Sequence, residues 1–391
     1  FLTTKTMLNA PSAPNRWRFL ALITYNGALL VATLHFTSQL TAQLSSAHVP
    51  SPQSIDDLHK SRHNERPPPP LPVERSSSTK REKFGSCLLV NDDNHWLIEW
   101  LAYHYYVLPL TSLIIAVDPN SKTSPDEVLS RWSGRIDVEI WDDSMIDFPS
   151  PETLLGADPN DAKYRVHFHR VRQAYFYQRC MKKHKQKRVK WVLLTDTDEF
   201  IRPILSRQKR FQRRGVFHRT LERKFSNSEC IVLPRVQFGS RDVSPDKLPQ
   251  LEPPGINSTS MLTTRFQYRE EEFMELGKNL VNVQAVESFP HTPPMSVHQV
   301  LPSCNASATT LDVPGILHHY TGTLEQFKFR DDPRNAVGMR FNHRIRNKRA
   351  SQVYDSSITS WVDSFVRYVG KNEAVHLLRN VGEIGKWWWW V

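Results

Sequence analysis

The sequence predicts an α/β protein built around a parallel, nucleotide-binding sheet. Strand-like and helix-like segments alternate from residue 84 to about 233, and polar residues follow the apolar segments where strands would end. The chain has 391 residues, of which 39% are hydrophobic, so it can form one large domain or two ordinary ones with appendages.

The expected elements follow from periodicity. Residues 87–90 form a short apolar strand, and Asn91 or Asp92 can cap the next helix. Apolar side chains recur at every third or fourth position in residues 96–108, which predicts a helix with one apolar face. Further strands are expected at residues 112–117, 135–141, 191–194 and 230–233, and helices at residues 166–181 and 360–378. Between residues 240 and 315 the pattern weakens into proline-punctuated loops.

The most informative segment is residues 190–201, where an apolar strand ends in Asp196, Asp198 and Glu199. Unpaired carboxylates inside a strand are costly, so these side chains should lie at its end, where open α/β sheets bind ligands. Asp-x-Asp offers hard oxygen ligands to Mn²⁺ or Mg²⁺, and such a cation can hold a phosphate-bearing substrate. For the motif alone, an acidic turn that caps the next helix is the alternative.

Two later segments add polar residues. These are Gly277-Lys278-Asn279, with His298 about twenty residues further on, and Leu317-His318-His319-Tyr320. A histidine beside Asp-x-Asp can complete a metal site, because imidazole and carboxylates together suit Mn²⁺. A histidine pair is more often structural than ligating, so this assignment needs further support.

Together the motifs resemble a known family. The segments are Asn91, Glu99-Trp100, the turn Asp118-Pro119-Asn120-Ser121, the core Trp191…Asp196-Thr197-Asp198-Glu199-Phe200-Ile201, Gly277-Lys278 and His319-Tyr320. Over residues 85–330 they resemble glycosyltransferase family 92 and the related family-2-like group. The resemblance implies a GT-A fold, a Rossmann-like nucleotide-sugar-binding sheet flanked by helices. It also implies metal-dependent, inverting transfer of a hexose, with galactose from UDP-galactose favoured, to a glycan or glycoprotein acceptor.

Residue by residue, the resemblance implies a donor site. Asp196, Asp198 and His319 would hold Mn²⁺ or Mg²⁺ with the diphosphate, and Lys278 would pair with phosphate. Asp118 would lie near the nucleoside, and Glu99 would contact the nucleotide or face solvent on its helix. The family commonly has Asn-Glu after the first strand, whereas this chain has Asn91-Asp92-Asp93.

An inverting transfer also needs a carboxylate base for the acceptor hydroxyl. The candidates are Asp331, Asp332 and the glutamates of residues 270–272, and Asp332 is our choice. Asp-Asp-Pro is also an ordinary turn.

Two other functions compete with glycosyl transfer. One is a non-catalytic or degenerate glycan-binding domain. The other is a haloacid-dehalogenase-like phosphatase, which normally has Thr or Val where Phe200 stands and places its motif near the start of its domain.

The segment before residue 84 predicts membrane attachment. Residues 19–36 are apolar and about long enough to span a bilayer, and Lys or Arg residues precede but do not closely follow them. The positive-inside rule makes residues 1–18 a cytoplasmic tail and residues 19–36 a transmembrane signal anchor. A cleaved signal peptide is the alternative. Residues 37–83, rich in Pro and Ser, would be a disordered stem. Residues 84–345 would be the lumenal transferase domain of a single-pass type II protein of the Golgi or endoplasmic reticulum, and residues 346–391 a basic, helical extension.

Charge and cysteines add limits. The net charge of +11 includes basic clusters at residues 182–190 and 207–214, which we interpret as solvated faces with no nucleic-acid partner. The four cysteines lack Cys-x-x-Cys spacing, which argues against a zinc or redox site. In an oxidising lumen they could form two disulfides, and the sequence leaves all three pairings open.

Overall fold

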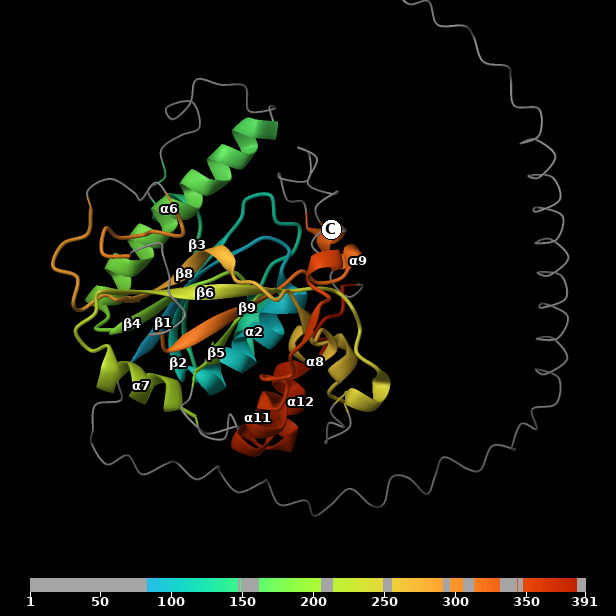
Figure 1. Cartoon of the computed structure of the whole chain (residues 1–391). Coiled ribbons are helices and arrows are strands. Elements are labelled where there is room, and N and C mark those ends of the chain that lie inside the picture. Colours follow the sequence, from blue (N-terminus) through green and yellow to red (C-terminus); the bar gives the residue numbers. More distant parts are fainter. Residues whose placement is uncertain are drawn as a thin grey trace, which may run out of the picture. The chain divides into compact units, whose positions relative to one another are not determined.

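The structure is a computed structural model that describes residues 83–146, 148, 162–204, 214–248, 255–290, 296–304, 313–330, 343 and 347–384 (Figure 1). The chain divides into two compact units, Phe1–Ser77 and Ser78–Val391, and every described residue belongs to the second. The expected tail, anchor and nearly all of the expected stem lie outside the described residues. Among the described helices, none combines the length and apolar character needed to cross a bilayer.

The centre of the second unit is a ten-stranded mixed sheet. Its strands are β1 (Phe84–Val90), β2 (Leu110–Val117), β3 (Asp137–Trp141), β4 (Trp191–Leu194), β5 (Glu199–Pro203), β6 (Cys230–Phe238), β7 (Tyr268–Arg269), β8 (Met274–Asn282), β9 (Gly315–Tyr320) and β10 (Val353–Tyr354). The order is β10-β7-β6-β8-β4-β1-β2-β3, and β9 pairs with β5 and β6. The four strands β3, β2, β1 and β4 are parallel, as the sequence predicts, and the sheet becomes mixed from β8 onward.

Strand β8 lies in a region where the sequence pattern predicts loops. It runs antiparallel between β4 and β6, in the middle of the sheet. Its polar residues Lys278 and Asn279 are buried and hydrogen-bond to Asp196 and to the Val297 carbonyl oxygen, so the usual alternation of apolar and polar side chains is lost. Gly277 is required by close approach, since a Cβ there would lie 2.5 Å from the Leu233 carbonyl oxygen.

Helices cover both faces of the sheet (Figure 1). Helix α6 (Ala162–Gln186) packs on one face, and α2 (Asn94–Val107), α11 (Trp361–Val369) and α12 (Lys371–Leu378) lie on the other. Strand β1 serves both layers, because Leu88 belongs to the α2 core and Leu89 to the α6 core. The shorter elements are α3 (Asp126–Ser130), α4 (Asp143–Ile146), α7 (Val216–Lys224), α8 (Leu262–Arg265), α9 (Leu324–Phe329) and the 3₁₀ turns η2 (Pro245–Lys247) and η3 (Ser258–Ser260).

Helix α2 differs from its expected amphipathic form, because every one of its residues is buried. The sheet covers one side, and α11 and α12 cover another. The expected C-terminal extension therefore contributes core side chains such as Trp361 and Phe365 to the same unit as β1. The expected single helix at residues 360–378 is two helices, separated at Gly370, whose φ is +91°.

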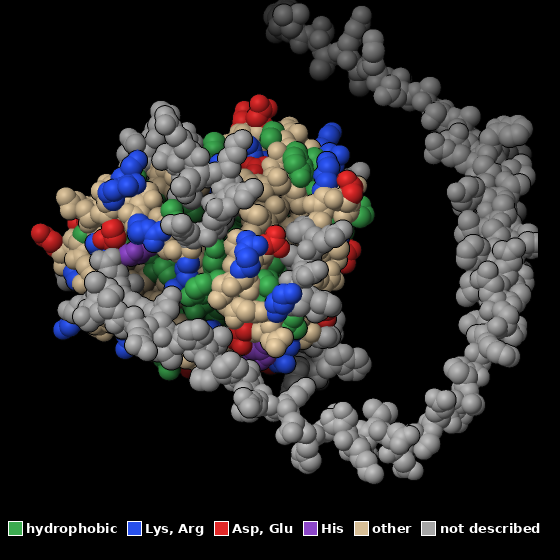
Figure 2. All heavy atoms as spheres, turned by 90° about the horizontal axis from the view of Figure 1, so that it is seen from below, with side chains coloured by type: hydrophobic (Ala, Val, Ile, Leu, Met, Phe, Trp, Pro, Cys, Tyr) green, Lys and Arg blue, Asp and Glu red, His purple; other side chains and the backbone are tan. Residues whose placement is uncertain are grey.

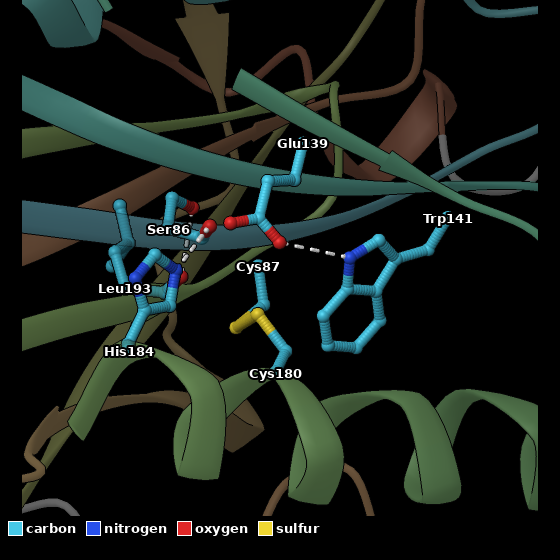
Figure 3. The surroundings of a disulfide bond; sticks show 7 residues. All are labelled: Ser86, Cys87, Glu139, Trp141, Cys180, His184 and Leu193. Carbon is cyan, nitrogen blue, oxygen red and sulfur yellow. Dashed lines mark hydrogen bonds between the residues drawn. A yellow bond between two sulfur atoms is a disulfide. The ribbon is translucent and has the colours of Figure 1, made fainter. Parts of the chain in front are cut away.

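Two disulfides resolve the cysteine pairing. Cys87–Cys180 joins β1 to α6 (Figure 3). Cys230–Cys304 joins β6 to the segment after β8. His184 lies beside the first disulfide, and its Nε2 is 3.1 Å from the Ser86 carbonyl oxygen. Cys87, Cys180 and His184 lie close enough together to resemble a metal site. The two sulfurs are bonded to each other, however, so the group offers no thiolate to a metal.

Candidate functional site

The Asp-x-Asp motif lies in the turn between β4 and β5, as its strand-end position predicts. Strand β4 is fully buried, and the chain leaves it at Thr195 to form the turn. Glu199 begins β5, and its backbone N–H donates to the Asp196 carbonyl oxygen at 3.2 Å, closing the turn. The motif leads into another strand, which excludes the alternative in which it caps a following helix.

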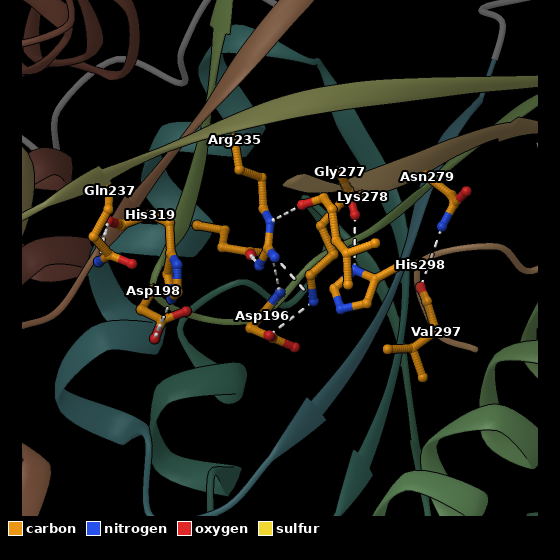
Figure 4. A network of polar contacts seen from close by, with 12 residues as sticks. Asp196, Asp198, Arg235, Gln237, Gly277, Lys278, Asn279, Val297, His298 and His319 are labelled. Carbon is orange, nitrogen blue, oxygen red and sulfur yellow. Dashed lines mark hydrogen bonds and ion pairs between the residues drawn. The ribbon is translucent and has the colours of Figure 1, made fainter. Parts of the chain in front are cut away.

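Asp196, whose side chain is 32% exposed, joins a network of otherwise buried charges (Figure 4). Its Oδ2 lies 2.8 Å from Nζ of Lys278, which is also 3.4 Å from Glu199 Oε2. The other Glu199 oxygen lies 2.9 Å from Nη1 of Arg235. Gln173 on α6 reaches Asp196 Oδ1 at 3.4 Å. The network therefore draws on four elements far apart in the sequence.

The network keeps Asp196 charged. Burial alone would raise the pKa of Asp196, but the ammonium of Lys278 outweighs it and holds that pKa well below its ordinary value. Conversely, burial would lower the pKa of Lys278, and the carboxylates of Asp196 and Glu199 raise it above its ordinary value. Lys278, which the resemblance assigns to phosphate, is 2% exposed and serves these carboxylates in the structure.

Asp198 and His319 form a second contact at the same edge of the sheet, the edge at which the parallel strands end. Glu199 of β5 pairs with His319 of β9, which brings Nε2 of His319 to 3.5 Å from Asp198 Oδ2. The Tyr320 N–H also donates to the Asp198 carbonyl oxygen at 2.9 Å. Burial opposes charge on Asp198, but His319 holds the pKa of that carboxyl below its usual value.

These residues fit a divalent cation. Asp198 Oδ1 and His319 Nδ1 are buried and have no hydrogen-bond partner among the described residues, so ligand capacity remains on both side chains. Two carboxylates and an imidazole are a ligand set that suits Mn²⁺. Asp196 is turned toward Lys278, and the three expected ligands are not gathered within 4.8 Å of one another. Binding of a cation would require Asp196 to share its carboxylate between the metal and Lys278.

Asp118 lies at the carboxyl end of β2, where the resemblance expects the nucleoside. Its Oδ1 accepts from the Asn120 N–H at 3.0 Å, and its Oδ2 faces His169 at 3.7 Å and Arg172 at 3.8 Å. Burial raises its pKa, but these donors and cations outweigh burial and lower it overall. Helix α6 thus presents Arg172 toward Asp118 and the adjacent Gln173 toward Asp196. These two contacts link the end of β2 to the Asp-x-Asp turn after β4.

Glu99 corrects the sequence interpretation. It neither faces solvent nor points to the Asp-x-Asp edge, because it is 1% exposed within α2. Its carboxylate accepts from the N–H groups of Leu262, at 2.6 Å, and Thr263, at 3.0 Å, at the start of α8. Burial raises its pKa to about 7, opposed by these hydrogen bonds. Its role in the structure is to cap α8.

The Asn91-Asp92-Asp93 turn also differs from expectation. Neither Asn91 nor Asp92 caps α2, whose N-cap position is Asp93 without a side-chain capping bond. Asp92, with φ of +55°, accepts through Oδ1 from the N–H groups of Lys122 and Thr123 and so fixes the loop after β2. Asp93 is buried and lies 3.6 Å from Arg330.

Several site residues were missed. Arg235, Asp93 and Arg330 carry no local sequence signal, since each is an ordinary polar residue in its own strand, turn or helix end. Tertiary packing between segments distant in the sequence places them there. The expected base Asp332, and Asp331 beside it, lie outside the described residues.

Two of the basic side chains at residues 182–190 form ion pairs with other described residues. Lys187 lies 2.6 Å from Asp137 and 2.9 Å from Glu139, and Lys190 pairs with Glu222. On the face shown in Figure 2, the visible Lys and Arg side chains are dispersed among other residues. This describes a solvated face with local charge pairs.

Comparisons with known proteins find only distant structural likeness. No protein-family model and no curated protein matches the chain. Core-mannan synthase A from Aspergillus fumigatus, in its Mn/GDP form, is 12% identical with a TM-score of 0.28, and the match covers 53% of this chain and 61% of that protein. Mouse xyloside xylosyltransferase 1, in its apo form, is 14% identical with a TM-score of 0.23, covering 57% and 73%. At these scores the likeness supports no conclusion on function.

Proposed function

We propose that this protein is a metal-dependent glycosyltransferase that transfers a hexose from a nucleotide sugar to a glycan or glycoprotein acceptor. The observation that carries the proposal is the pairing of Asp198 with His319 beside Asp196, at the carboxyl end of the parallel strands. Buried ligand atoms on Asp198 and His319, which have no hydrogen-bond partner in the described part of the chain, support a cation there, and a cation at that position suits a diphosphate.

The charges at the edge favour a cation as well. Four carboxylates, those of Asp93, Asp196, Asp198 and Glu199, face three side-chain cations, those of Lys278, Arg235 and Arg330. This excess of negative charge would repel a diphosphate. A bound divalent cation would reverse it and stabilise the charge that develops on the leaving group.

The chain's own residues have distinct parts in this proposal. Asp198 and His319 would hold the cation, and Lys278 would keep Asp196 ionised for the same purpose. Asp118 would bind the nucleoside, with His169 and Arg172 fixing its carboxylate. For inversion, a carboxylate must take the proton from the acceptor hydroxyl, and Asp332 stays our candidate.

The finer assignments rest on the sequence resemblance. Membership of family 92, a GT-A fold, galactose as the sugar and UDP-galactose as its donor are proposals of this kind. So is placement as a type II membrane protein with its catalytic domain in the lumen of the Golgi or endoplasmic reticulum. The two disulfides support a secretory compartment, because disulfides persist where the environment is oxidising.

The test is hydrolysis of a panel of nucleotide sugars by the full chain, with Mn²⁺ and with chelator. We expect Mn²⁺-dependent release of one nucleoside diphosphate, which would also name the donor. Release of inorganic phosphate from phosphate esters instead would favour the phosphatase alternative. A folded protein that binds glycans but neither hydrolyses any donor nor binds UDP or GDP with Mn²⁺ would favour the non-catalytic alternative.

A further inference from the structure

A surface turn of the second unit carries an acceptor motif for asparagine-linked glycans. Asn257-Ser258-Thr259 has the pattern Asn-x-Ser/Thr, in which the asparagine can be glycosylated in a secreted protein. The pattern recurs at Asn305-Ala306-Ser307, which lies outside the described residues. Because three-residue motifs also occur by chance, the pattern needs support from the surroundings of the asparagine itself.

The structure presents Asn257 on the surface, directly before the 3₁₀ turn η3. Asn257 is exposed, whereas residues on either side of the turn belong to the core: Ile256 is 7% exposed and Met261 is fully buried. The Ser260 N–H donates to the Asn257 carbonyl oxygen at 3.2 Å and closes the turn. The core residues therefore hold the motif in place, and its asparagine remains accessible.

The two ends of the Asn257 amide are used differently. Its Oδ1 accepts from the Thr259 N–H at 3.0 Å and from the Thr259 hydroxyl at 2.6 Å, whereas its Nδ2 donates to no described residue. In the buried residues Asn94 and Asn279, by contrast, Nδ2 donates to a backbone carbonyl oxygen, at 2.8 Å and 3.2 Å. A substituent on Nδ2 of Asn257 would therefore break no hydrogen bond between described residues.

We propose that Asn257 is a modification site that carries an asparagine-linked oligosaccharide. This inference rests on the proposed secretory placement and does not depend on the proposed glycosyl transfer. The two disulfides agree with that placement, because disulfides persist in the oxidising compartments of the secretory pathway. A glycan is bulky and hydrated, so it requires a surface asparagine, and the exposed Asn257 meets this requirement.

The substrate class is an oligosaccharide joined through its C1 to a lipid diphosphate, which a separate enzyme of the secretory pathway transfers. Nδ2 of Asn257 bonds to C1, and the bond from C1 to the diphosphate oxygen breaks with its electron pair left on the diphosphate. One proton leaves Nδ2 and goes to a base of the transferring enzyme. Oδ1 takes no part in the new bond, so the turn can keep both hydrogen bonds from Thr259.

The experiment maps the glycan on the full chain produced in the secretory pathway of eukaryotic cells. Peptide N-glycosidase releases the glycan and converts the modified asparagine into aspartate, so mass spectrometry of the peptide identifies the position. We expect this conversion at Asn257 in the wild-type chain. The mapping needs no variant, so it decides the question even where a substitution prevents folding.

Variants test the motif on the intact chain. Asn257→Gln and Thr259→Ala should each remove the mass of one glycan, and Thr259→Ser should keep it because serine also supplies a hydroxyl. Asn227→Gln is the matched control. Asn227 is exposed and is followed by Ser228-Glu229, so it lacks Ser or Thr at the third position and its replacement should leave the glycan mass unchanged.

An unmodified Asn257 in a chain whose cysteines are all disulfide-bonded overturns this inference and leaves the secretory placement standing. A glycan on Asn305 alone has the same meaning. A chain with four free thiols and no glycan overturns the secretory placement together with this inference. None of these results bears on donor hydrolysis, which is measured separately and decides the proposed function.

Discussion

Nε2 of His319 lies 3.5 Å from Oδ2 of Asp198, across the antiparallel pair of β5 and β9. The two residues are about 120 positions apart in the sequence, and the register that places Glu199 opposite His319 also sets this contact. Strand pairing places the imidazole more rigidly than a loop would, so the pair is a preorganised part of the edge.

The first prediction concerns Asp198. Asp198→Ala should abolish Mn²⁺-dependent hydrolysis of the donor, with a loss of at least about 100-fold, because it removes a carboxylate ligand. Far-ultraviolet circular dichroism should be unchanged. Asp242→Ala, which removes an exposed carboxylate, is the control and should keep full activity. Wild-type turnover in Asp198→Ala would contradict the assignment of the metal site.

The second prediction concerns Lys278. Lys278→Met should lower the free energy of unfolding by about 3 kcal/mol, because it leaves Asp196 and the fully buried Glu199 with less compensating charge. Urea denaturation measures the change. Adding Asp196→Asn to Lys278→Met should restore part of the stability. Lys187→Met, which breaks a surface pair, should cost less than about 1 kcal/mol. Similar costs for both lysines would show that the buried network is not stabilising.

The third prediction separates Glu99 from substrate binding. Glu99→Gln should lower the free energy of unfolding by about 1–3 kcal/mol, because an amide nitrogen cannot accept from the backbone at the start of α8. The KM for the donor should stay at the wild-type value. Glu373→Gln, at a surface pair on α12, serves as the matched control. A raised KM for the donor with an unchanged free energy of unfolding would instead support a contact between Glu99 and the nucleotide.

The fourth prediction is a dependence of stability on pH. Burial lowers the pKa of His104 from 6.5 to about 3, opposed by its contact with the Trp100 carbonyl oxygen. The unfolded chain therefore binds a proton that the folded chain does not. This contribution to stability is complete above pH 6.5 and is lost as the pH falls toward 3.

The test compares unfolding free energies at pH 6.5 and pH 5. The wild-type chain should lose about 1.6 kcal/mol more than His104→Leu over this interval, because the slope rises toward roughly 1.4 kcal/mol per pH unit as the pH falls below the unfolded pKa. His376→Leu replaces an exposed histidine and should follow the wild-type curve. Parallel curves for wild type and His104→Leu would mean that His104 is protonated equally in both states.

Local patterns were sufficient for much of the fold. The alternation of β1, α2, β2 and β3 and the helix α6 follow the expected segments, with their ends shifted by a few residues. Strand β8 was missed because its buried residues Lys278 and Asn279 are polar, so the segment lacks the apolar pattern that predicts a strand. The prediction that α2 has one exposed face was wrong, because α11 and α12, which come much later in the sequence, cover the side that the sheet leaves open.

The sequence by itself determined where Asp196 and Asp198 lie, because carboxylates cannot remain inside a buried strand and must mark its end. Only the tertiary structure decided which residues meet them. Lys278 of β8 contacts Asp196 and His319 of β9 contacts Asp198, and pairing between strands distant in sequence brings them together. Glu99 shows the same division: its place on a helix follows from local periodicity, and its contact with α8 follows from tertiary packing on the face of the sheet that α2 covers.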